Sequence, residues 1–373
     1  MDINGALQAI RAAGNFRSIP AEDAVTGVDL SSNDYLGFGE DGQLRERFFA
    51  AQRPQDMLMS ASASRLLSQY QSDFTALERL LSESYGGRAA LLFNSGYHAN
   101  TGLVSALASD GHTLIVADRL VHASIIDGIK LSGAPFERFR HNDLTHLQRL
   151  IERHLGAFST ILIVVESVYS MDGDCADLAA IAALKRHYGD RVMLYVDEAH
   201  AVGAVGPAGL GEAARCGVLD DVDVLVGTLG KALASTGAFA ILAPAMRDFM
   251  VNRARSLIFS TALPPLCARW SSFVWERSLT ADSARQELQK RAELLARIIP
   301  GSEPSHIRPL IVGNAARAVE LSRKLLAEGF KVLPIRTPTV PPGTERLRFS
   351  LSAAINEAEL QHLGHVLPNL INQ

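Results

Sequence analysis

The sequence predicts an α/β fold with a mostly parallel sheet, followed by a smaller C-terminal α+β domain. Six short apolar runs are bounded by turn residues, and helical patterns lie between several of them. Most of these runs are apolar on both faces, as expected for strands that helices cover on both sides. The length of 373 residues exceeds that of a typical single domain. Alternating strands and helices, followed by a change of pattern, therefore indicate a large parallel α/β domain with a second domain.

The elements of the large domain follow directly from these patterns. Strands are expected at 89–93, 113–116, 161–165, 192–196, 222–226 and 238–242, and helices at 3–14, 74–83, 143–153, 177–187 and 244–256. Each strand is short and rich in Val, Ile, Leu or Ala, which favours a buried strand over a surface loop.

The adjacent prolines Pro264 and Pro265 mark a break in the pattern. Beyond them we expect helices at 266–278, 284–298, 314–327 and 357–367, and strands at 307–312, 330–333 and 346–351. We therefore divide the chain into an N-terminal helix and connector (1–40), a large α/β domain (41–262) and a small α+β domain (263–373).

Composition excludes several classes of function. The formal net charge is −4 and no basic stripe is present, so neither a nucleic acid nor a membrane surface is an expected partner. The three cysteines lie far apart in the sequence, which is typical of a reducing compartment. The N-terminus lacks the pattern of a signal peptide, and no run of eighteen apolar residues predicts a membrane span. We expect a cytoplasmic protein.

Polar residues follow the expected strands at their carboxyl ends, where open α/β sheets bind ligands. Gly96 comes after the strand at 89–93 and opens a helix, Asp197 and His200 come after 192–196, and Lys231 comes after 222–226. Taken alone, each has an ordinary explanation: a lysine after a glycine turn usually faces solvent, and an aspartate that ends a strand is often a helix cap.

Three other cofactor sites are not supported. The segment from Gly227 to Ala232 has two residues between its glycines instead of four and lacks the hydroxyl that a P-loop uses to hold magnesium. No G-x-G-x-x-G opens a helix, and neither an H-E-x-x-H motif nor a Cys/His cluster indicates a metal site.

The combination does match pyridoxal 5'-phosphate (PLP). This cofactor needs a lysine that forms a Schiff base, an acid beside its pyridine nitrogen and an anion site for its phosphate. Lys231, Asp197 and the helix that starts at Gly96 are candidates for these three roles.

Beyond this chemistry, the chain resembles the α-oxoamine synthase family of fold-type I PLP enzymes over nearly its whole length. The resemblance is carried by the segments SNDYLG (32–37), SRLLS (64–68), LFNSGYHAN (92–100), DRLVHAS (118–124), ESVYSMDGD (166–174), VDEAHAVGAVGPAGLG (196–211), TLGKA (228–232), STALPP (260–265) and PTVPPGTERLR (338–348). It implies an enzyme that joins an amino acid to an acyl thioester with loss of carbon dioxide.

The resemblance also implies a role for each matching residue. The implied cofactor residues are Lys231 (Schiff base and proton carrier), Asp197 (pyridine nitrogen), His200 (ring hydroxyl), His122 (stacked on the ring), Gly96, Tyr97 and Thr228 (phosphate), Ser170 (near the ring) and Thr261 (phosphate of a neighbouring subunit). The implied substrate residues are Arg348, which grips the amino-acid carboxylate, together with Asn33, His122, Arg17 and Thr339. The position of Thr261 implies a homodimer.

Within the family, the segments 138–147, 307–314 and 335–354 are similar to the branch that condenses L-alanine with a pimeloyl thioester in biotin synthesis. Coenzyme A and an acyl carrier protein both stay open as the carrier of the acyl group. The alternatives are glycine C-acetyltransferase, 5-aminolevulinate synthase and long-chain acyl synthases, and, outside this chemistry, a non-catalytic partner subunit or a plain aminotransferase.

Two segments depart from the family pattern. The run at 59–64 and the run at 234–237 contain alanine and serine where most of the family has glycine. These side chains stay small but lack the freedom of glycine at positive φ. We expect the channel for the acyl thioester, not the cofactor site, to be affected.

Overall fold

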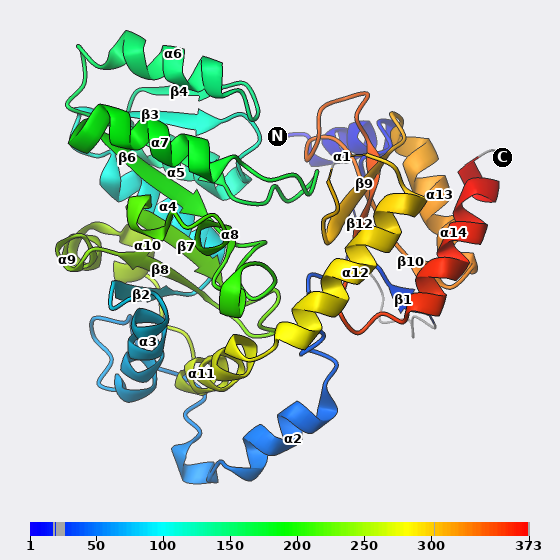
Figure 1. The fold of residues 1–373 in the computed structure, drawn as a ribbon, viewed down its shortest axis with the longest axis horizontal. Coiled ribbons are helices and arrows are strands. Elements are labelled where there is room, and N and C mark those ends of the chain that lie inside the picture. The colour runs from blue at the N-terminus through cyan, green and yellow to red at the C-terminus, as the bar shows by residue number, and fades with distance from the viewer. Residues whose placement is uncertain (18, 20–26, 302, 372–373) are drawn as a thin grey trace. The chain divides into compact units, whose positions relative to one another are not determined.

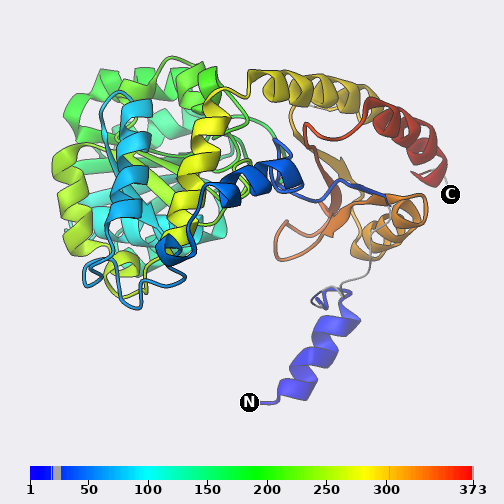
Figure 2. The same cartoon turned by 90° about the horizontal axis from the view of Figure 1, so that it is seen from below.

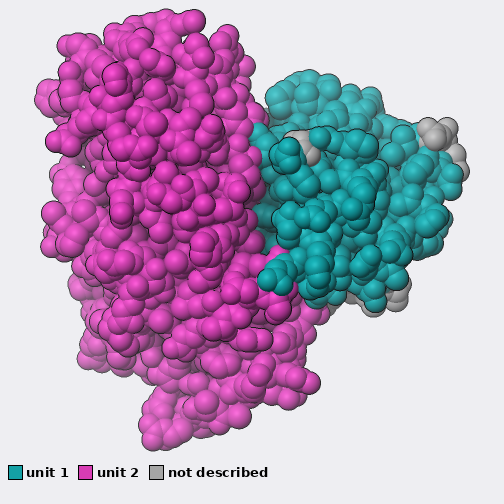
Figure 3. All heavy atoms as spheres, in the orientation of Figure 1, with its two compact units in different colours: residues 1–35, 170–174, 286–373 teal, residues 36–169, 175–285 magenta. Residues whose placement is uncertain are grey.

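The computed structural model describes residues 1–17, 19, 27–301 and 303–371. It forms two compact units, which Figure 3 shows in different colours. The smaller unit comprises Met1–Tyr35, Ser170–Asp174 and Gln286–Gln373, and the larger unit comprises Leu36–Tyr169 and Cys175–Arg285.

A seven-stranded sheet with the strand order β2-β8-β7-β6-β5-β3-β4 is the centre of the larger unit (Figure 1). Its strands are β2 (Ala89–Phe93), β3 (Thr113–Asp118), β4 (Phe136–Phe139), β5 (Thr160–Glu166), β6 (Val192–Asp197), β7 (Val224–Thr228) and β8 (Ala238–Leu242). Strand β8 runs antiparallel to β2 and β7, and the other neighbouring pairs are parallel. The predicted mostly parallel sheet is confirmed, and each of its six predicted strands is present.

The sequence did not predict strand β4. It pairs with β3 at one edge of the sheet. Its residues are not continuously apolar, because Glu137 and Arg138 occupy its centre and Phe136 is exposed. An edge strand has one unpaired side, so it carries charged residues that a central strand does not tolerate.

Helices cover both faces of this sheet (Figure 2). The helices of the larger unit are α2 (Gly42–Ala50), α3 (Ser72–Ser84), α4 (Gly96–Leu107), α5 (Ala123–Ser132), α6 (Leu144–His154), α7 (Leu178–Tyr188), α8 (Glu212–Arg215), α9 (Pro244–Arg253), α10 (Arg255–Ile258) and α11 (Pro265–Leu279), with short 3-10 turns at Pro54–Asp56, Gly189–Arg191, Pro207–Gly209 and Leu219–Asp221. Helix α2 lies away from the sheet (Figure 1). On one face, Leu103 of α4 and Ile125 of α5 pack in one core with Val164 of β5. This packing fixes the start of α4 and of α5, where two of the predicted site motifs lie.

The division between the units differs from the boundary expected at 262. Helix α11 belongs to the larger unit, because its Trp275 packs 5.5 Å from the ring of Phe239 and donates a hydrogen bond to Ser84 Oγ at 2.9 Å. The units therefore divide inside α12 (Asp282–Ile298), after Arg285. The prolines mark the start of a helix at this point and not the end of a domain.

The smaller unit combines two small sheets with helices. Strands β9 (Ile307–Ile311), β11 (Leu333–Ile335) and β12 (Arg346–Ser350) form an antiparallel sheet, β1 (Val28–Asp29) pairs in parallel with β10 (Phe330–Lys331), and the helices are α1 (Ile3–Ala12), α12, α13 (Ala315–Ala327) and α14 (Glu357–Ile371). The predicted α+β character is confirmed. The N-terminal residues belong to this unit because β1 pairs with β10.

None of the helices in the described part of the chain is long and apolar enough to cross a bilayer.

Candidate active site

Lys231 and His200 meet although 31 residues separate them. His200 follows β6 and Lys231 follows β7, and these two strands are neighbours in the sheet. The Nζ atom of Lys231 lies 2.7 Å from Nε2 of His200, which is buried. The parallel order of the strands thus brings the predicted Schiff-base lysine to the predicted partner of the ring hydroxyl.

Asp197 ends β6 and is 4% exposed. Its Oδ1 accepts a hydrogen bond from the backbone N–H of Ala199 at 2.9 Å, and its Oδ2 accepts one from Nδ2 of Asn100 at 2.7 Å. A carboxylate has about four acceptor sites, so two bonds leave capacity for a further N–H donor. The geometry therefore suits a carboxylate that binds a protonated ring nitrogen.

Asn100 lies one turn into α4 and connects three buried side chains. Its Oδ1 accepts a hydrogen bond from the hydroxyl of Tyr195 at 2.6 Å. Its Nδ2 donates to Ser124 Oγ at 2.9 Å as well as to Asp197. The side-chain amide thus has partners on both sides within the larger unit.

His122 is the N-cap of α5. Its Nδ1 accepts a hydrogen bond from the backbone N–H of Ser124 at 3.2 Å and lies 2.8 Å from Ser124 Oγ. Desolvation by the surrounding protein lowers the pKa of His122 below its usual value, and the carboxylate of Asp197 opposes this shift only in part. The imidazole is therefore neutral over a wider pH range than a free histidine.

The predicted phosphate residues lie at the start of α4 and the end of β7. Ser95 caps α4 by accepting the N–H of His98 at 3.2 Å, and a Cβ built on Gly96 would meet no atom within 4 Å. The first turn of α4 therefore presents backbone N–H groups beside open space, which favours an anion. The hydroxyl of Tyr97 donates to Asp127 at 2.7 Å, and Oγ1 of Thr228 accepts the N–H of Gly230 at 3.3 Å.

Thr261 lies beside the loop that leads into α4. Its carbonyl oxygen accepts a hydrogen bond from Nδ2 of Asn94 at 2.5 Å, and its backbone forms an isolated bridge with Ser64. Its side chain is exposed, as a residue that reaches another subunit needs to be.

A second cluster lies in the smaller unit and is centred on Arg348 of β12, which is 7% exposed. Its Nε donates to the carbonyl oxygen of Ser170 at 2.6 Å, and its Nη2 donates to Oδ1 of Asn33 at 3.1 Å. The hydroxyl of Tyr35 donates to the same Oδ1 at 3.1 Å. The structure thus groups Ser170 with the predicted substrate residues Arg348 and Asn33.

Arg346 lies two residues before Arg348 on the same strand and differs from it in its ion pairs. Arg346 forms an ion pair with Asp172, whereas Arg348 forms no ion pair with any carboxylate in the described ranges. A guanidinium has five N–H donors, of which Arg348 uses two here. Arg348 therefore keeps charge and donors for an anionic ligand.

Two further predicted substrate residues meet in the smaller unit. Nη2 of Arg17 donates to Oγ1 of Thr339 at 3.2 Å, although 322 residues separate them. Both residues are exposed. The structure thus places the two residues in contact, and their role in substrate binding stays a prediction.

Comparison with known proteins assigns the family. The aminotransferase class I and II family matches residues 25–367. The chain belongs to this family.

Two relatives have the same name. The chain is 46% identical to the 8-amino-7-oxononanoate synthase of Haemophilus ducreyi over 90% of this chain and 89% of that protein. It is 41% identical to the 8-amino-7-oxononanoate synthase of Chlorobaculum parvum over 97% of each chain.

Among solved structures, a serine palmitoyltransferase from S. paucimobilis with a bound adduct of PLP and myriocin is similar with a TM-score of 0.89 and 28% identity, over 99% of this chain and 96% of that chain. The predicted fold type and family resemblance are confirmed.

The sequence analysis of this member of the aminotransferase class I and II family did not predict three residues of the buried hydrogen-bond network, Asn100, Tyr195 and Ser124. A signal was present, because Asn100 and Thr101 are polar residues in an otherwise apolar turn of α4.

The sequence analysis also missed Glu198, whose buried carboxylate accepts hydrogen bonds from Ser167 Oγ at 2.6 Å and from the backbone N–H groups of residues 212 and 213 at 2.9 and 2.7 Å. Burial raises the pKa of Glu198 to about 7.

The unusual segment after Lys231 lines an apolar cavity of the larger unit. Residues 234–236, with Phe48, Trp270 and others, surround a cavity of about 320 Å³. Ala234 has a φ of +45°, a conformation that glycine adopts without strain. The segment that departs from the family pattern thus forms part of a cavity wall, and the contact between Lys231 and His200 is present.

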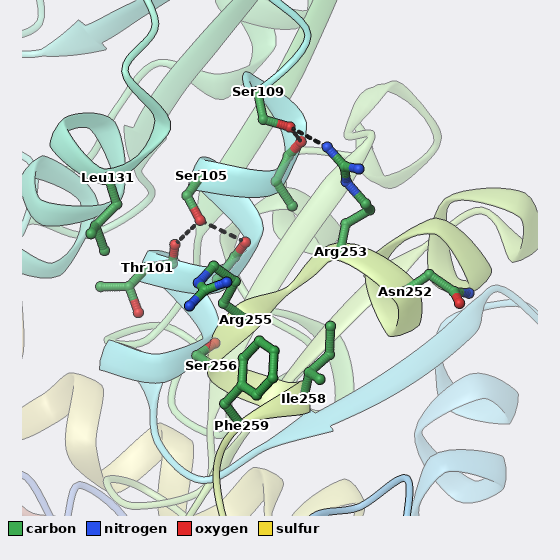
Figure 4. A pocket seen from close by; sticks show the side chains of 12 residues that line it. Thr101, Ser105, Ser109, Leu131, Asn252, Arg253, Arg255, Ser256, Ile258 and Phe259 are labelled. Carbon is green, nitrogen blue, oxygen red and sulfur yellow. Dashed lines mark hydrogen bonds between the residues drawn. The ribbon is translucent and has the colours of Figure 1, made fainter.

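A larger cavity of about 490 Å³ lies along the C-terminal half of α4, where it also meets α9 and α10 (Figure 4). Ser105 donates to the carbonyl of Thr101 at 2.6 Å, and Arg253 donates to Ser109 at 3.3 Å. None of the predicted site residues lines this cavity.

Proposed function

We propose that this chain is a PLP-dependent acyltransferase that condenses L-alanine with a pimeloyl thioester to give 8-amino-7-oxononanoate, carbon dioxide and free thiol, a step of biotin biosynthesis. The observation that carries the proposal is the 46% identity to an 8-amino-7-oxononanoate synthase over nine tenths of the chain. The geometry of the larger unit supports it, because the sites that PLP needs come together there.

The residues present fit PLP. In the cofactor, the carbon that reacts with a lysine and the ring hydroxyl are adjacent, and Lys231 and His200 are likewise in contact. Asp197 retains acceptor capacity for the ring nitrogen, and the first turn of α4 offers N–H groups to the phosphate. We assign Gly96, Tyr97 and Thr228 to the phosphate, and Thr261 to the phosphate of a second subunit in a homodimer.

When bound, PLP supplies an electron sink that stabilises negative charge at Cα of the amino acid. Lys231 would hold the cofactor covalently, and its Nζ, released when the amine of the amino acid takes its place, would take the proton from Cα and later return one. The Asp197 carboxylate keeps the ring nitrogen protonated. His122 covers one face of the ring and, being neutral, contacts the substrate without adding charge.

The substrate residues of the smaller unit have complementary roles. Arg348 binds the carboxylate of the amino acid, and Asn33 orients the guanidinium by accepting its Nη2–H. Ser170 holds the same guanidinium through its carbonyl oxygen. Arg17 and Thr339 contact the acyl substrate, for which a terminal carboxylate is a suitable partner of Arg17.

A panel of acyl donors tests this function. Release of free thiol is followed with PLP-loaded protein and pimeloyl, acetyl, succinyl and palmitoyl thioesters of coenzyme A, each with alanine, glycine or serine. We expect thiol release to be fastest with the pimeloyl thioester and alanine. Fastest release with palmitoyl thioester and serine would overturn the proposal in favour of a serine palmitoyltransferase, the enzyme that the similar solved structure represents.

The source of the acyl group is a separate question. Pimeloyl groups on coenzyme A and on an acyl carrier protein are compared at equal concentration, and a lower KM identifies the donor that the protein uses. The cytoplasmic location expected from the sequence stays a prediction.

A further inference from the structure

The amide of Asn100 can take only one orientation. Its Nδ2 faces Oδ2 of Asp197 at 2.7 Å, and a carboxylate oxygen only accepts hydrogen bonds. A flipped amide would place Oδ1 against that carboxylate in a buried environment, which is costly. The hydroxyl of Tyr195, 2.6 Å from Oδ1, donates to the amide from the other side and secures the same orientation.

This orientation determines where the proton of Ser124 lies. Ser124 Oγ accepts the second N–H of the Asn100 amide at 2.9 Å. Its own proton is then directed to Nδ1 of His122, which lies 2.8 Å away. Ser124 is fully buried, so solvent does not compete for this hydroxyl.

His122 consequently has a defined tautomer. Its Nδ1 also accepts the backbone N–H of Ser124 at 3.2 Å, and a backbone N–H can only donate. With two donors directed at Nδ1, that nitrogen is unprotonated and the neutral imidazole carries its proton on Nε2. A proton on Nδ1 would face the protons of both donors, which is unfavourable.

We propose that Asn100 is a positioning residue that aligns the Asp197 carboxylate and, through Ser124, holds His122 as the Nε2–H tautomer, with Tyr195 fixing the orientation of the amide. One buried side chain thereby controls two of the groups that contact the cofactor. His122 is then a hydrogen-bond donor through Nε2 and not a base. The kinetic part of this inference rests on the proposed function, whereas the tautomer does not.

Nitrogen-15 NMR of histidine-labelled protein tests the tautomer in the cofactor-free and PLP-loaded chain, with His122→Gln used to assign the signals. Above the pKa of His122, we expect a protonated Nε2 and an unprotonated Nδ1. A protonated Nδ1 in the cofactor-free protein would overturn the inference whatever the activity of the enzyme, so its failure is distinguishable from a failure of the proposed function.

Two variants test the role of Asn100, and a third is the control. Asn100→Ala removes the whole link, and Tyr195→Phe removes a single hydroxyl. Thr101→Val changes the adjacent residue, whose hydroxyl donates to the carbonyl of Tyr97 and lies outside the network.

We expect kcat to fall roughly 10- to 100-fold in Asn100→Ala, as for loss of hydrogen bonds to a charged group, and about threefold to tenfold in Tyr195→Phe. The KM values should change less, and Asn100→Ala should show the Nδ1–H tautomer as an additional His122 signal. Thr101→Val should keep the wild-type tautomer. Wild-type kcat in Tyr195→Phe would overturn the role of the network, even if Asn100→Ala does not fold.

Discussion

Nζ of Lys231 lies 2.7 Å from Nε2 of His200, a contact that joins the loops after two neighbouring parallel strands. His200 lies three residues after Asp197, which ends β6, and it would not reach Lys231 if β6 and β7 were not neighbours in the sheet. The order of the strands thus assembles the cluster on which the proposed chemistry depends.

Replacing Lys231 with alanine should abolish turnover, because no other residue is assigned to the covalent attachment or to proton transfer at Cα. The measurement is product formation together with borohydride reduction and peptide mapping of PLP-loaded protein. Lys290→Ala is the control, since Lys290 is exposed on α12. Sustained multiple turnover by Lys231→Ala would contradict the assignment.

Replacing Asp197 with asparagine should lower kcat roughly 10²- to 10⁴-fold, because a neutral amide does not hold the ring nitrogen protonated. Cofactor binding, measured by the visible absorption of PLP, should persist. Asp177→Asn is a matched control, because Asp177 caps α7 and asparagine caps helices equally well. Equal kcat values for the two variants would argue against the role of Asp197.

Replacing Arg348 with glutamine should raise KM for the amino acid roughly 10- to 100-fold, as expected for loss of a charge-assisted hydrogen bond to a carboxylate. Arg346 lies two residues away on the same strand, but its charge is already paired with Asp172. Arg346→Gln should therefore lower the midpoint of thermal unfolding and leave this KM nearly unchanged. The reverse pattern of KM values would show that Arg346 is the substrate ligand.

The stability of the protein should depend on Glu198 between about pH 4.5 and 7. Burial raises the pKa of Glu198 from 4.5 to about 7, so the folded state holds a proton that the unfolded chain has released in this interval. The free energy of unfolding should consequently fall as the pH rises, by up to roughly 3 kcal/mol from this group.

Glu198→Gln removes this titration, and urea unfolding of both proteins at several pH values measures the difference. We expect the curves of stability against pH to converge at low pH and to separate as the pH rises. Parallel curves for wild type and variant would show that Glu198 does not titrate in this range.

The sequence predicted the strands of the large sheet well because their apolar runs depend on burial on both faces. Lys231, Asp197 and Gly96 were candidates from the sequence because each lies at the carboxyl end of a strand or within three residues after it. The sequence did not predict Asn100, Tyr195 and Ser124, since their roles arise from hydrogen bonds between elements that are distant in sequence. The compact units divide after Arg285 and not at residue 262, a difference that the sequence does not reveal because the packing of Trp275 on Phe239 leaves no local pattern.

The most direct test of the proposed function is mass spectrometry of the product that PLP-loaded protein forms from pimeloyl-CoA and L-alanine labelled with carbon-13 at the carboxyl group. We predict 8-amino-7-oxononanoate without the label and labelled carbon dioxide in equal amount. A product that retains the label, or product from glycine or serine but none from alanine, would contradict the account.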